Sequence, residues 1–282
     1  MHGRKKVSID EAEKIKAQQK AKKIKLSVAQ VMESRGDEEK EKALIATKTP
    51  ILDYLDDFAS LWNMRKQEVL KNPTKEVVDE ELQISTRVLM SNPKSYWAWH
   101  HRRWCIDLIE DYDAHSEVEL CAKFIAADSR NFHAWRHRRW AVAKCGDMAD
   151  KELENTTKLI EYNFSNFSAW HYRSQLEKVT DYEEEIQFAQ NAFWTDANDQ
   201  SSWIYYRWLL SRPTIASNTE LLQTEFASME ELIDAEPKCK YPLLAAIWIQ
   251  RKLPQPDEKR IAELIEKLVV LDPIRAPYYR EQ

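Results

Sequence analysis

Five tryptophans recur along the chain at nearly constant spacing, and this repeat constrains the fold more than any other feature. Each lies in a similar segment, in which an Asn or Asp is followed by a short polar stretch, then Trp, then Arg. The clearest copies are "NPKSYWAWHHRRW" (92–104) and "DSRNFHAWRHRRW" (128–140). The repeated tryptophans are Trp62, Trp99, Trp135, Trp170 and Trp203, separated by 37, 36, 35 and 33 residues. Self-similarity at a fixed period indicates a repeat array.

An arginine accompanies each tryptophan. It follows three residues later in the first four copies and four residues later in the fifth. The residues are Arg65, Arg102, Arg138, Arg173 and Arg207. Both offsets place the two side chains on one helix face. We expect the tryptophans to pack between neighbouring hairpins, and the arginines to bind carbonyl groups of an adjacent helix or stack on aromatic rings.

A period near 35 residues accommodates two helices and two turns. The pattern therefore predicts an all-α fold in which about six helical hairpins stack into a curved, tetratricopeptide-like solenoid. A weaker sixth copy, "DPIRAPYYR" (272–280), has Tyr278 or Tyr279 in place of Trp. We predict two parts, a basic N-terminal helical segment over residues 1–45 and a helical-repeat domain over residues 46–282.

Glycine usage supports the helical prediction. Average usage would give roughly 20 glycines in a chain of this length, and there are three, Gly3, Gly36 and Gly146. Hairpin turns, bulges and phosphate-binding loops need glycine for positive φ or for close backbone approach. A β-sandwich, a dinucleotide-binding fold and a P-loop are therefore disfavoured.

Cysteine placement and the lack of targeting signals predict a cytoplasmic protein. No apolar run approaches the roughly 18 residues of a transmembrane helix, and "MHGRKKVSIDEAEKIK" lacks the apolar centre of a secretory leader. The cysteines lie far apart, which is typical of reduced thiols rather than a disulfide framework or a zinc ligand set. They are Cys105, Cys121, Cys145 and Cys239.

Charge is distributed unevenly along the chain. The total is −5, and residues 1–48 hold 13 Lys and Arg against 8 acidic residues, a local net of +5 that leaves −10 for residues 49–282. A nucleic-acid binder normally shows a basic body that neutralises phosphates. We therefore expect no nucleic acid among the partners.

The signatures quoted above resemble the repeat of protein prenyltransferase alpha subunits, in which Pro or Asn, an aromatic residue, Trp and Arg recur on helical pairs. The resemblance covers nearly the whole chain. Within the family, the opening "MHGR" and the segments "NFSNFSAWHYRS" and "NAFWTDANDQSSWIYYRWLL" look like the Rab geranylgeranyltransferase (type II) branch. The chain lacks the immunoglobulin-like and leucine-rich domains that animal members often append, so it is either a compact form or a truncated one.

The resemblance implies a fold, a reaction and a set of partners. The alpha subunit would form a right-handed crescent around a beta subunit, and only the heterodimer would be active. The beta subunit would hold the zinc that activates the substrate cysteine, and geranylgeranyl diphosphate would lie at the subunit boundary. The product would be a Rab GTPase modified at its C-terminal cysteines, with an escort protein presenting the Rab.

The same resemblance suggests site residues in two turns. Lys94 matches a lysine that reaches the isoprenoid diphosphate, and Tyr96 matches an aromatic residue of the same turn. Cations near a departing diphosphate lower the barrier by stabilising its growing charge. In the next repeat, Asn131 and His133 match positions near the diphosphate in farnesyl-type members, although Phe132 stands where those members have Tyr. The alternatives are a solvated lysine at 94 and an aromatic residue at 96 that only fills the subunit interface.

Histidines raise the question of a metal site. His133 and His137 have the four-residue spacing of helical metal ligands, but no third ligand accompanies them. His2 lies at the terminus and could reach the partner's zinc as an additional, inhibitory ligand, because neutral imidazole binds zinc well. The alternative is a terminal tail with no ligand role.

Three classes of function remain open at this point. The first is the non-zinc subunit of a two-chain prenyltransferase, either Rab-type or the farnesyltransferase and type I geranylgeranyltransferase alpha subunit. The second is a non-catalytic helical-repeat scaffold, and the third is a helical-repeat RNA binder, which the net charge of the body disfavours. The turn that carries Lys94 and Tyr96 separates the first two classes, because a plain scaffold would not need it.

Overall fold

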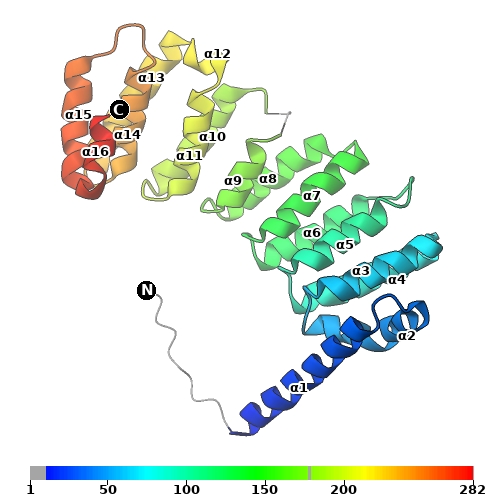
Figure 1. The fold of residues 1–282 in the computed structure, drawn as a ribbon. Helices are drawn as coiled ribbons and strands as arrows, with labels where there is room; N and C mark the ends of the chain where they lie inside the picture. The colour runs from blue at the N-terminus through cyan, green and yellow to red at the C-terminus, as the bar shows by residue number, and fades with distance from the viewer. Residues whose placement is uncertain (1–10, 177–178, 282) are drawn as a thin grey trace. The chain divides into compact units, whose positions relative to one another are not determined.

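The fold is built from helices only in the part of the chain that the structure describes. The computed structural model describes residues 11–176 and 179–281, and every regular element within them is a helix (Figure 1). The all-α prediction with repeated helical hairpins is therefore confirmed. Within these ranges, no helix is both long enough and apolar enough to span a bilayer.

The chain divides into two compact units, which are described separately. The first contains the described residues up to 124 together with 136–141. It is formed by α1 (Glu11–Glu33), α2 (Glu38–Lys48), η1 (Thr49–Asp53), α3 (Ala59–Lys71), α4 (Lys75–Ser91), α5 (Tyr96–Ile106) and parts of α6 (His115–Ala127) and α7 (Phe132–Cys145). The predicted boundary at residue 45 stays a prediction, and α2 runs across it.

The second unit contains residues 125–135 and the described residues from 142 onward. Besides the remaining parts of α6 and α7, it holds the C-terminal helices. They are α8 (Ala149–Tyr162), α9 (Phe167–Arg173), α10 (Tyr182–Thr195), α11 (Gln200–Leu210), α12 (Pro213–Ala216), α13 (Thr219–Ala235), α14 (Lys240–Gln250), α15 (Glu258–Leu271), η2 (Pro273–Arg275) and α16 (Ala276–Arg280).

Helices that carry the repeated tryptophans alternate with helices that do not. We call α3, α5, α7, α9 and α11 the tryptophan helices and α4, α6, α8 and α10 the intervening helices. Among these helices, the most extensive packing joins an intervening helix to the tryptophan helix that follows it, as in α4 with α5 and α10 with α11. Successive tryptophan helices also contact each other, because α3 packs on α5 and α9 packs on α11. The turn with the Asn or Asp therefore lies inside a hairpin, between an intervening helix and its tryptophan helix.

A polar residue four positions before the tryptophan starts four of these helices, α5, α7, α9 and α11, whereas α3 begins after Phe58 without a side-chain cap. Ser95 accepts a hydrogen bond from the Ala98 N–H, and Asn166 accepts one from the Ala169 N–H. Asn131 and Asp199 cap α7 and α11 in the same way. Such caps satisfy backbone donors that the first helical turn leaves without partners.

The repeated tryptophans form the centre of each unit. All five are at most 6% exposed, and Trp62, Trp170 and Trp203 are almost completely buried. Each of the first four packs on the residue two positions after the next tryptophan. Trp62 lies 4.7 Å from the His101 ring and Trp170 lies 4.9 Å from the Tyr205 ring, between centroids. One aromatic contact per repeat therefore joins successive hairpins.

Burial predicts which tryptophans stabilise the fold. We expect Trp170→Ala to lower the free energy of unfolding by about 3–5 kcal/mol, because it removes a large buried side chain and leaves a cavity. Trp194→Ala, a matched change at a side chain that is 43% exposed, should cost less than about 1 kcal/mol. Urea denaturation followed by circular dichroism measures both values, and equal losses would contradict the packing described here.

Candidate functional site

Buried arginine–glutamate pairs hold the hairpins of the first unit together. Arg102 binds Glu117 with both ends of its guanidinium, at 2.6 Å from Nε to Oε2 and 2.6 Å from Nη2 to Oε1. His137 adds a third contact, 2.8 Å from its Nε2 to Glu117 Oε2. One carboxylate on α6 therefore joins side chains from α5 and α7. Arg65, Glu81 and His101 repeat the arrangement one hairpin earlier.

The second unit contains the same arrangement with tyrosine in place of histidine. Arg173 binds Glu185 through Nε and Nη2 at 2.7 and 2.5 Å, and Tyr205 donates its hydroxyl to Glu185 Oε2 at 2.6 Å. The remaining guanidinium nitrogen, Nη1, donates to the Leu153 carbonyl oxygen. The carbonyl contact matches the expectation from sequence, whereas the glutamate partner was not foreseen.

The fifth repeat differs from the first four in where its arginine lies. Arg207 is exposed, and its guanidinium lies over the Trp248 ring, 4.5 Å from the centroid. Tyr206 instead occupies the interior position three residues after Trp203, and its hydroxyl donates to Glu225 at 2.6 Å. Arg207 therefore stacks on an aromatic ring, one of the two roles expected for the repeated arginines, but it does so at the surface rather than in the core.

Burial and hydrogen bonding act in opposite directions on the Glu117 carboxylate. Burial alone would raise its pKa, but hydrogen bonds from His137 and Arg102 and the positive charge of Arg102 outweigh burial and lower the pKa to about 2. For His137, burial is the larger influence and lowers the pKa of the imidazole, against the bond to Glu117. Glu117 is thus ionised and His137 neutral near neutral pH.

Each repeated tryptophan also fixes the turn that precedes its helix. The indole N–H donates to the carbonyl oxygen six residues earlier, from Trp62 to Asp56 and from Trp99 to Pro93 in the first unit. The corresponding bonds in the second unit run from Trp135 to Ser129, Trp170 to Phe164 and Trp203 to Ala197. The Trp99 bond ends one residue before Lys94, so the framework directly positions the predicted site turn.

Further hydrogen bonds hold the turn over residues 92–95. The Lys94 N–H donates to Asn92 Oδ1 at 3.2 Å, and Asn92 Nδ2 donates to Asp56 Oδ2 at 2.8 Å. Asp57 Oδ1 accepts from the Ser95 hydroxyl and from the Trp97 N–H, both at 3.1 Å. The backbone that carries Lys94 is therefore fastened to the preceding repeat, while the Lys94 side chain is exposed.

Lys94 lies beside the start of α5, where the electrostatics favour an anion. It occupies the residue before the N-cap Ser95, and helix N-termini carry a positive partial charge. The exposed cation and the helix start together can bind a negatively charged group. This placement is compatible with the predicted diphosphate contact, which stays a prediction.

Aromatic and basic side chains continue from the turn onto an exposed face of α5. Tyr96 is 52% exposed, and its ring stacks on His100 with a centroid distance of 6.2 Å. His100 Nε2 lies 3.1 Å from Lys66 Nζ of α3, and that ammonium lies 5.0 Å from the Trp104 ring centroid. We call Lys66, Tyr96, Trp97 and His100 the α5 face. Sequence reasoning missed Lys66, because it lies 34 residues from its contact.

Burial lowers the pKa of both basic groups at the centre of the α5 face. Burial lowers the pKa of His100, and the positive charge of Lys66 lowers it further. Burial also lowers the pKa of Lys66. His100 is therefore a neutral acceptor for the Lys66 ammonium, and the face presents one cation surrounded by rings.

The second pair of predicted site residues lies at the start of α7. Asn131 is fully buried, and its side-chain oxygen accepts from the His133 and Ala134 N–H groups at 3.1 and 3.2 Å. The geometry gives Asn131 the role of a helix cap. The His133 ring packs on Phe132, 4.0 Å between centroids, and Phe132 is 65% exposed. Contact of either predicted residue with a substrate stays a prediction.

Two sets of histidines bear on metal binding. Within residues 11–176 and 179–281, no three His, Cys, Asp or Glu side chains are arranged to hold a metal ion. The His137 ring nitrogen Nε2 is hydrogen-bonded to the Glu117 carboxylate. His2 lies outside the described residues, and its proposed zinc contact stays a prediction.

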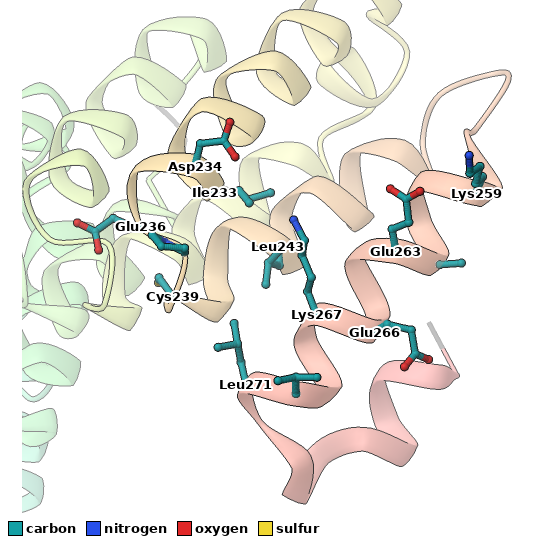
Figure 2. A pocket seen from close by; sticks show the side chains of 13 residues that line it. Ile233, Asp234, Glu236, Cys239, Leu243, Lys259, Glu263, Glu266, Lys267 and Leu271 are labelled. Carbon is teal, nitrogen blue, oxygen red and sulfur yellow. The ribbon is translucent and has the colours of Figure 1, made fainter.

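A groove lies near the C-terminal end of the chain. It has a volume of about 980 Å³ and is lined by α13, α14, α15 and the turn before α14. Figure 2 shows Lys267 extending from α15 across the groove near Leu243, with Asp234 on α13 and Glu263 on α15 at its sides. Apolar and charged side chains share its lining.

Comparison with known proteins gives the class of the fold. The protein prenyltransferase alpha subunit repeat matches residues 78–109, 114–145, 149–178 and 182–213. The first match spans α4 and α5 and the last spans α10 and α11. A chain in the solved structure of Candida albicans protein geranylgeranyltransferase-I complexed with GGPP has the same fold, with a TM-score of 0.71 and 22% identity over 91% of this chain and 87% of that chain. The fold and its buried framework define a prenyltransferase alpha-type repeat protein.

Similar proteins assign the chain to one family within this class. Geranylgeranyl transferase type-2 subunit alpha of Dictyostelium discoideum is 31% identical, over 99% of this chain and 98% of the relative. The Schizosaccharomyces pombe protein of that name is also 31% identical, over 99% and 97%. The chain belongs to the family of geranylgeranyl transferase type-2 alpha subunits. It is 36% identical to the Bos taurus member, over 75% of this chain, and the match spans 42% of that longer relative.

The buried carboxylate of Glu117 generates a pH-dependent prediction. We expect Glu117→Gln to cost about 3–5 kcal/mol at neutral pH, because it leaves the Arg102 charge buried without its partner. A depressed carboxylate pKa contributes stability above the unfolded-state value, near 4.5, and loses it as pH falls toward about 2. The difference between wild type and variant should therefore shrink by about 3 kcal/mol between pH 5 and pH 2.

Denaturant titrations at several pH values measure this difference. Glu119→Gln is the matched control, because Glu119 is exposed on the same helix, and its difference from wild type should stay small at every pH. A Glu117→Gln difference that does not change with pH would contradict the ionised, paired carboxylate.

Proposed function

We propose that this chain is the alpha subunit of a heterodimeric Rab geranylgeranyltransferase. In this role it supports transfer of geranylgeranyl from geranylgeranyl diphosphate to the C-terminal cysteines of Rab GTPases, and it is active only with a beta subunit. The observation that carries the proposal is the match, over nearly their full lengths, to two relatives that are named geranylgeranyl transferase type-2 subunit alpha.

The proposed chemistry gives this chain an electrostatic role. During transfer the cysteine sulfur bonds to the first carbon of the isoprenoid, while the bond between that carbon and the diphosphate oxygen breaks. Negative charge grows on the departing diphosphate, and a cation fixed near it stabilises the transition state more than the ground state. Lys94 would supply that cation, and the hydrogen bonds around residues 92–95 would keep its backbone in place.

Other residues of the same surfaces would assist without taking part in bond changes. Tyr96 would contact the diphosphate or the beta subunit beside it, and the rest of the α5 face would pack against that subunit. His133 at the start of α7 would lie near the isoprenoid diphosphate, and Asn131 would hold the first turn of that helix. Exposed aromatic side chains such as Tyr96 and Phe132 are typical of protein interfaces.

Zinc would be held by the beta subunit, where it would activate the cysteine as a thiolate. The described residues of this chain do not offer a suitable ligand set, and no step of the mechanism above passes through a metal on this chain. An escort protein would present the Rab substrate, and the complex would work in the cytoplasm. The −10 net charge of residues 49–282 supports protein partners rather than nucleic acid.

Co-expression tests the assignment of this chain to the Rab-type enzyme. We expect a stable 1:1 complex with a Rab-type beta chain, measured by gel filtration and native mass spectrometry, and no complex with a farnesyl-type beta chain. The purified complex should prenylate a Rab in the presence of escort protein. Selective pairing with the farnesyl-type chain would instead identify a farnesyltransferase-type alpha subunit, and failure to bind either chain would favour a scaffold.

Mutation of Lys94 tests its catalytic role separately. Lys94→Ala should lower the turnover number of the heterodimer about 100-fold, the cost of about 3 kcal/mol for one lost donor at a developing charge. Lys75→Ala is the control, because Lys75 is exposed at the opposite end of α4. Single-turnover prenylation assays compare the two variants. Turnover of Lys94→Ala within twofold of wild type would remove Lys94 from the mechanism.

A further inference from the structure

A second concave site lies at the C-terminal ends of α11 and α14 in the second unit. These helices pack on each other, and a hollow of about 370 Å³ lies between their last turns. It is lined by Arg207, Leu210, Ser211, Ile247, Trp248, Arg251 and Lys252. The turn that starts α11 is at the other end of that helix, so this hollow is separate from the turns considered above. A volume of this size is in the range of small-ligand sites.

Three cations and no acidic side chain line the hollow. Arg207 lies over the Trp248 ring, and neither Arg207 nor Lys252 makes an ion pair with any carboxylate of the described residues. Arg251 has one acidic neighbour, Glu258, at 3.9 Å, which is near the limit of an ion pair and exposed. Exposed pairs of this kind contribute little. The chain body carries a net negative charge, so this is a local concentration of positive charge.

The negative partial charges at the two helix C-termini offset only part of the positive charge of the side chains. Each helix C-terminus carries about −0.5 of an elementary charge, so two of them amount to about −1. The three side chains bring +3, and Glu258 offsets at most one of these charges at long range. A positive excess of about +1 or more therefore remains at the hollow, where low-dielectric walls concentrate the field.

One residue that lines the hollow also carries a buried hydrogen-bond donor without a partner. The indole nitrogen of Trp248 is buried and has no acceptor among the described residues. Buried polar groups almost always have a partner, so an indole N–H without one indicates that an acceptor is missing. The hollow thus combines two guanidinium groups and one ammonium, and the indole of one lining residue holds a further, buried donor.

We propose that this hollow binds a phosphate group, either free phosphate or diphosphate or the phosphorylated headgroup of a lipid. A phosphate monoester carries a charge of about −1.5 to −2 and three acceptor oxygens, so it can accept from the guanidinium groups, the ammonium and the indole N–H together. Arginine matches phosphate with two parallel hydrogen bonds. A carboxylate has two oxygens in one plane and would leave donors unsatisfied. The site does not depend on the proposed transferase function.

The Trp248 indole gives a direct readout of binding. The full chain is labelled with nitrogen-15, and the Trp248 N–H signal is assigned from its absence in Trp248→Phe. Inorganic phosphate and diphosphate are titrated at low salt. We expect this signal to move downfield saturably, because the N–H gains an acceptor, while the other indole signals stay in place. No movement with either anion, together with no lipid binding in the assay below, would overturn the proposal.

Paired variants separate a specific site from general charge attraction. The double variant R207Q/K252Q should weaken phosphate binding about tenfold or more, because it removes two charge-assisted hydrogen bonds. Two controls accompany it. Lys238→Gln removes an exposed charge outside the hollow and should leave the affinity within about twofold. Trp248→Phe, read by calorimetry, should also weaken binding without a change in charge. Equal losses in Lys238→Gln and R207Q/K252Q, or none in R207Q/K252Q, would contradict the site.

Vesicles identify the source of the phosphate group. Phosphatidylcholine vesicles with and without a phosphoinositide are sedimented with the wild-type chain and with R207Q/K252Q. Phosphoinositide-dependent sedimentation that R207Q/K252Q loses assigns the site to a lipid headgroup. Binding of free phosphate or diphosphate alone assigns it to a soluble anion. If the cations only stabilise the helix ends, R207Q/K252Q will lower the melting temperature and leave both binding assays unchanged, which would overturn the proposal.

Discussion

The pairing of a buried arginine with a buried glutamate is the interaction on which the rest of the structure depends. Removing two charges from water costs several kcal/mol for each ion, and good geometry with full hydrogen bonding is needed to offset it. Glu117 meets this demand with Arg102 on one helix and His137 on another. A shift of any of the three helices along its axis would leave a charge or a polar group unsatisfied. The pair therefore fixes the register of the hairpins, which apolar packing alone would define less sharply.

The tryptophans connect this interior framework to the surface. Each indole ring contributes apolar area to the core. Its N–H donates a hydrogen bond to the turn before its own helix, as Trp99 does to the Pro93 carbonyl oxygen. The structure thus separates two tasks. Interior residues repeat because they hold the hairpins together, and turn residues differ because packing does not determine them. Lys94 belongs to the second group, and so do the exposed rings that follow it on α5.

Much of this framework can be predicted from the sequence, and there is a physical reason why the rest cannot. A large aromatic residue every 35 positions predicted the helical array. The glutamates were missed because they follow the arginines at variable distances, 16 residues for Glu81 and 12 for Glu185. They stand, however, at a constant 20 residues before the histidine or tyrosine that binds them, a signal that a search from the next tryptophan would have found. Lys66 and the hollow between α11 and α14 arise from contacts between repeats, which no local pattern encodes. The site role of Lys94 came from family resemblance alone.

The turns before the tryptophan helices have one further consequence. In four of them the backbone N–H two residues after an Asn or Asp donates to that side chain, and the donors are Lys94, Arg130, Ser165 and Asn198. The same backbone hydrogen bond forms in all four turns, while the side chains of the donor residues differ: two are basic, one carries a hydroxyl and one an amide. The side chain at these positions can therefore vary while the turn keeps its hydrogen bond. New surface chemistry can be introduced there by a single codon change without disturbing the fold, so a repeat array of this kind can acquire a binding site in one turn while its neighbours stay inert.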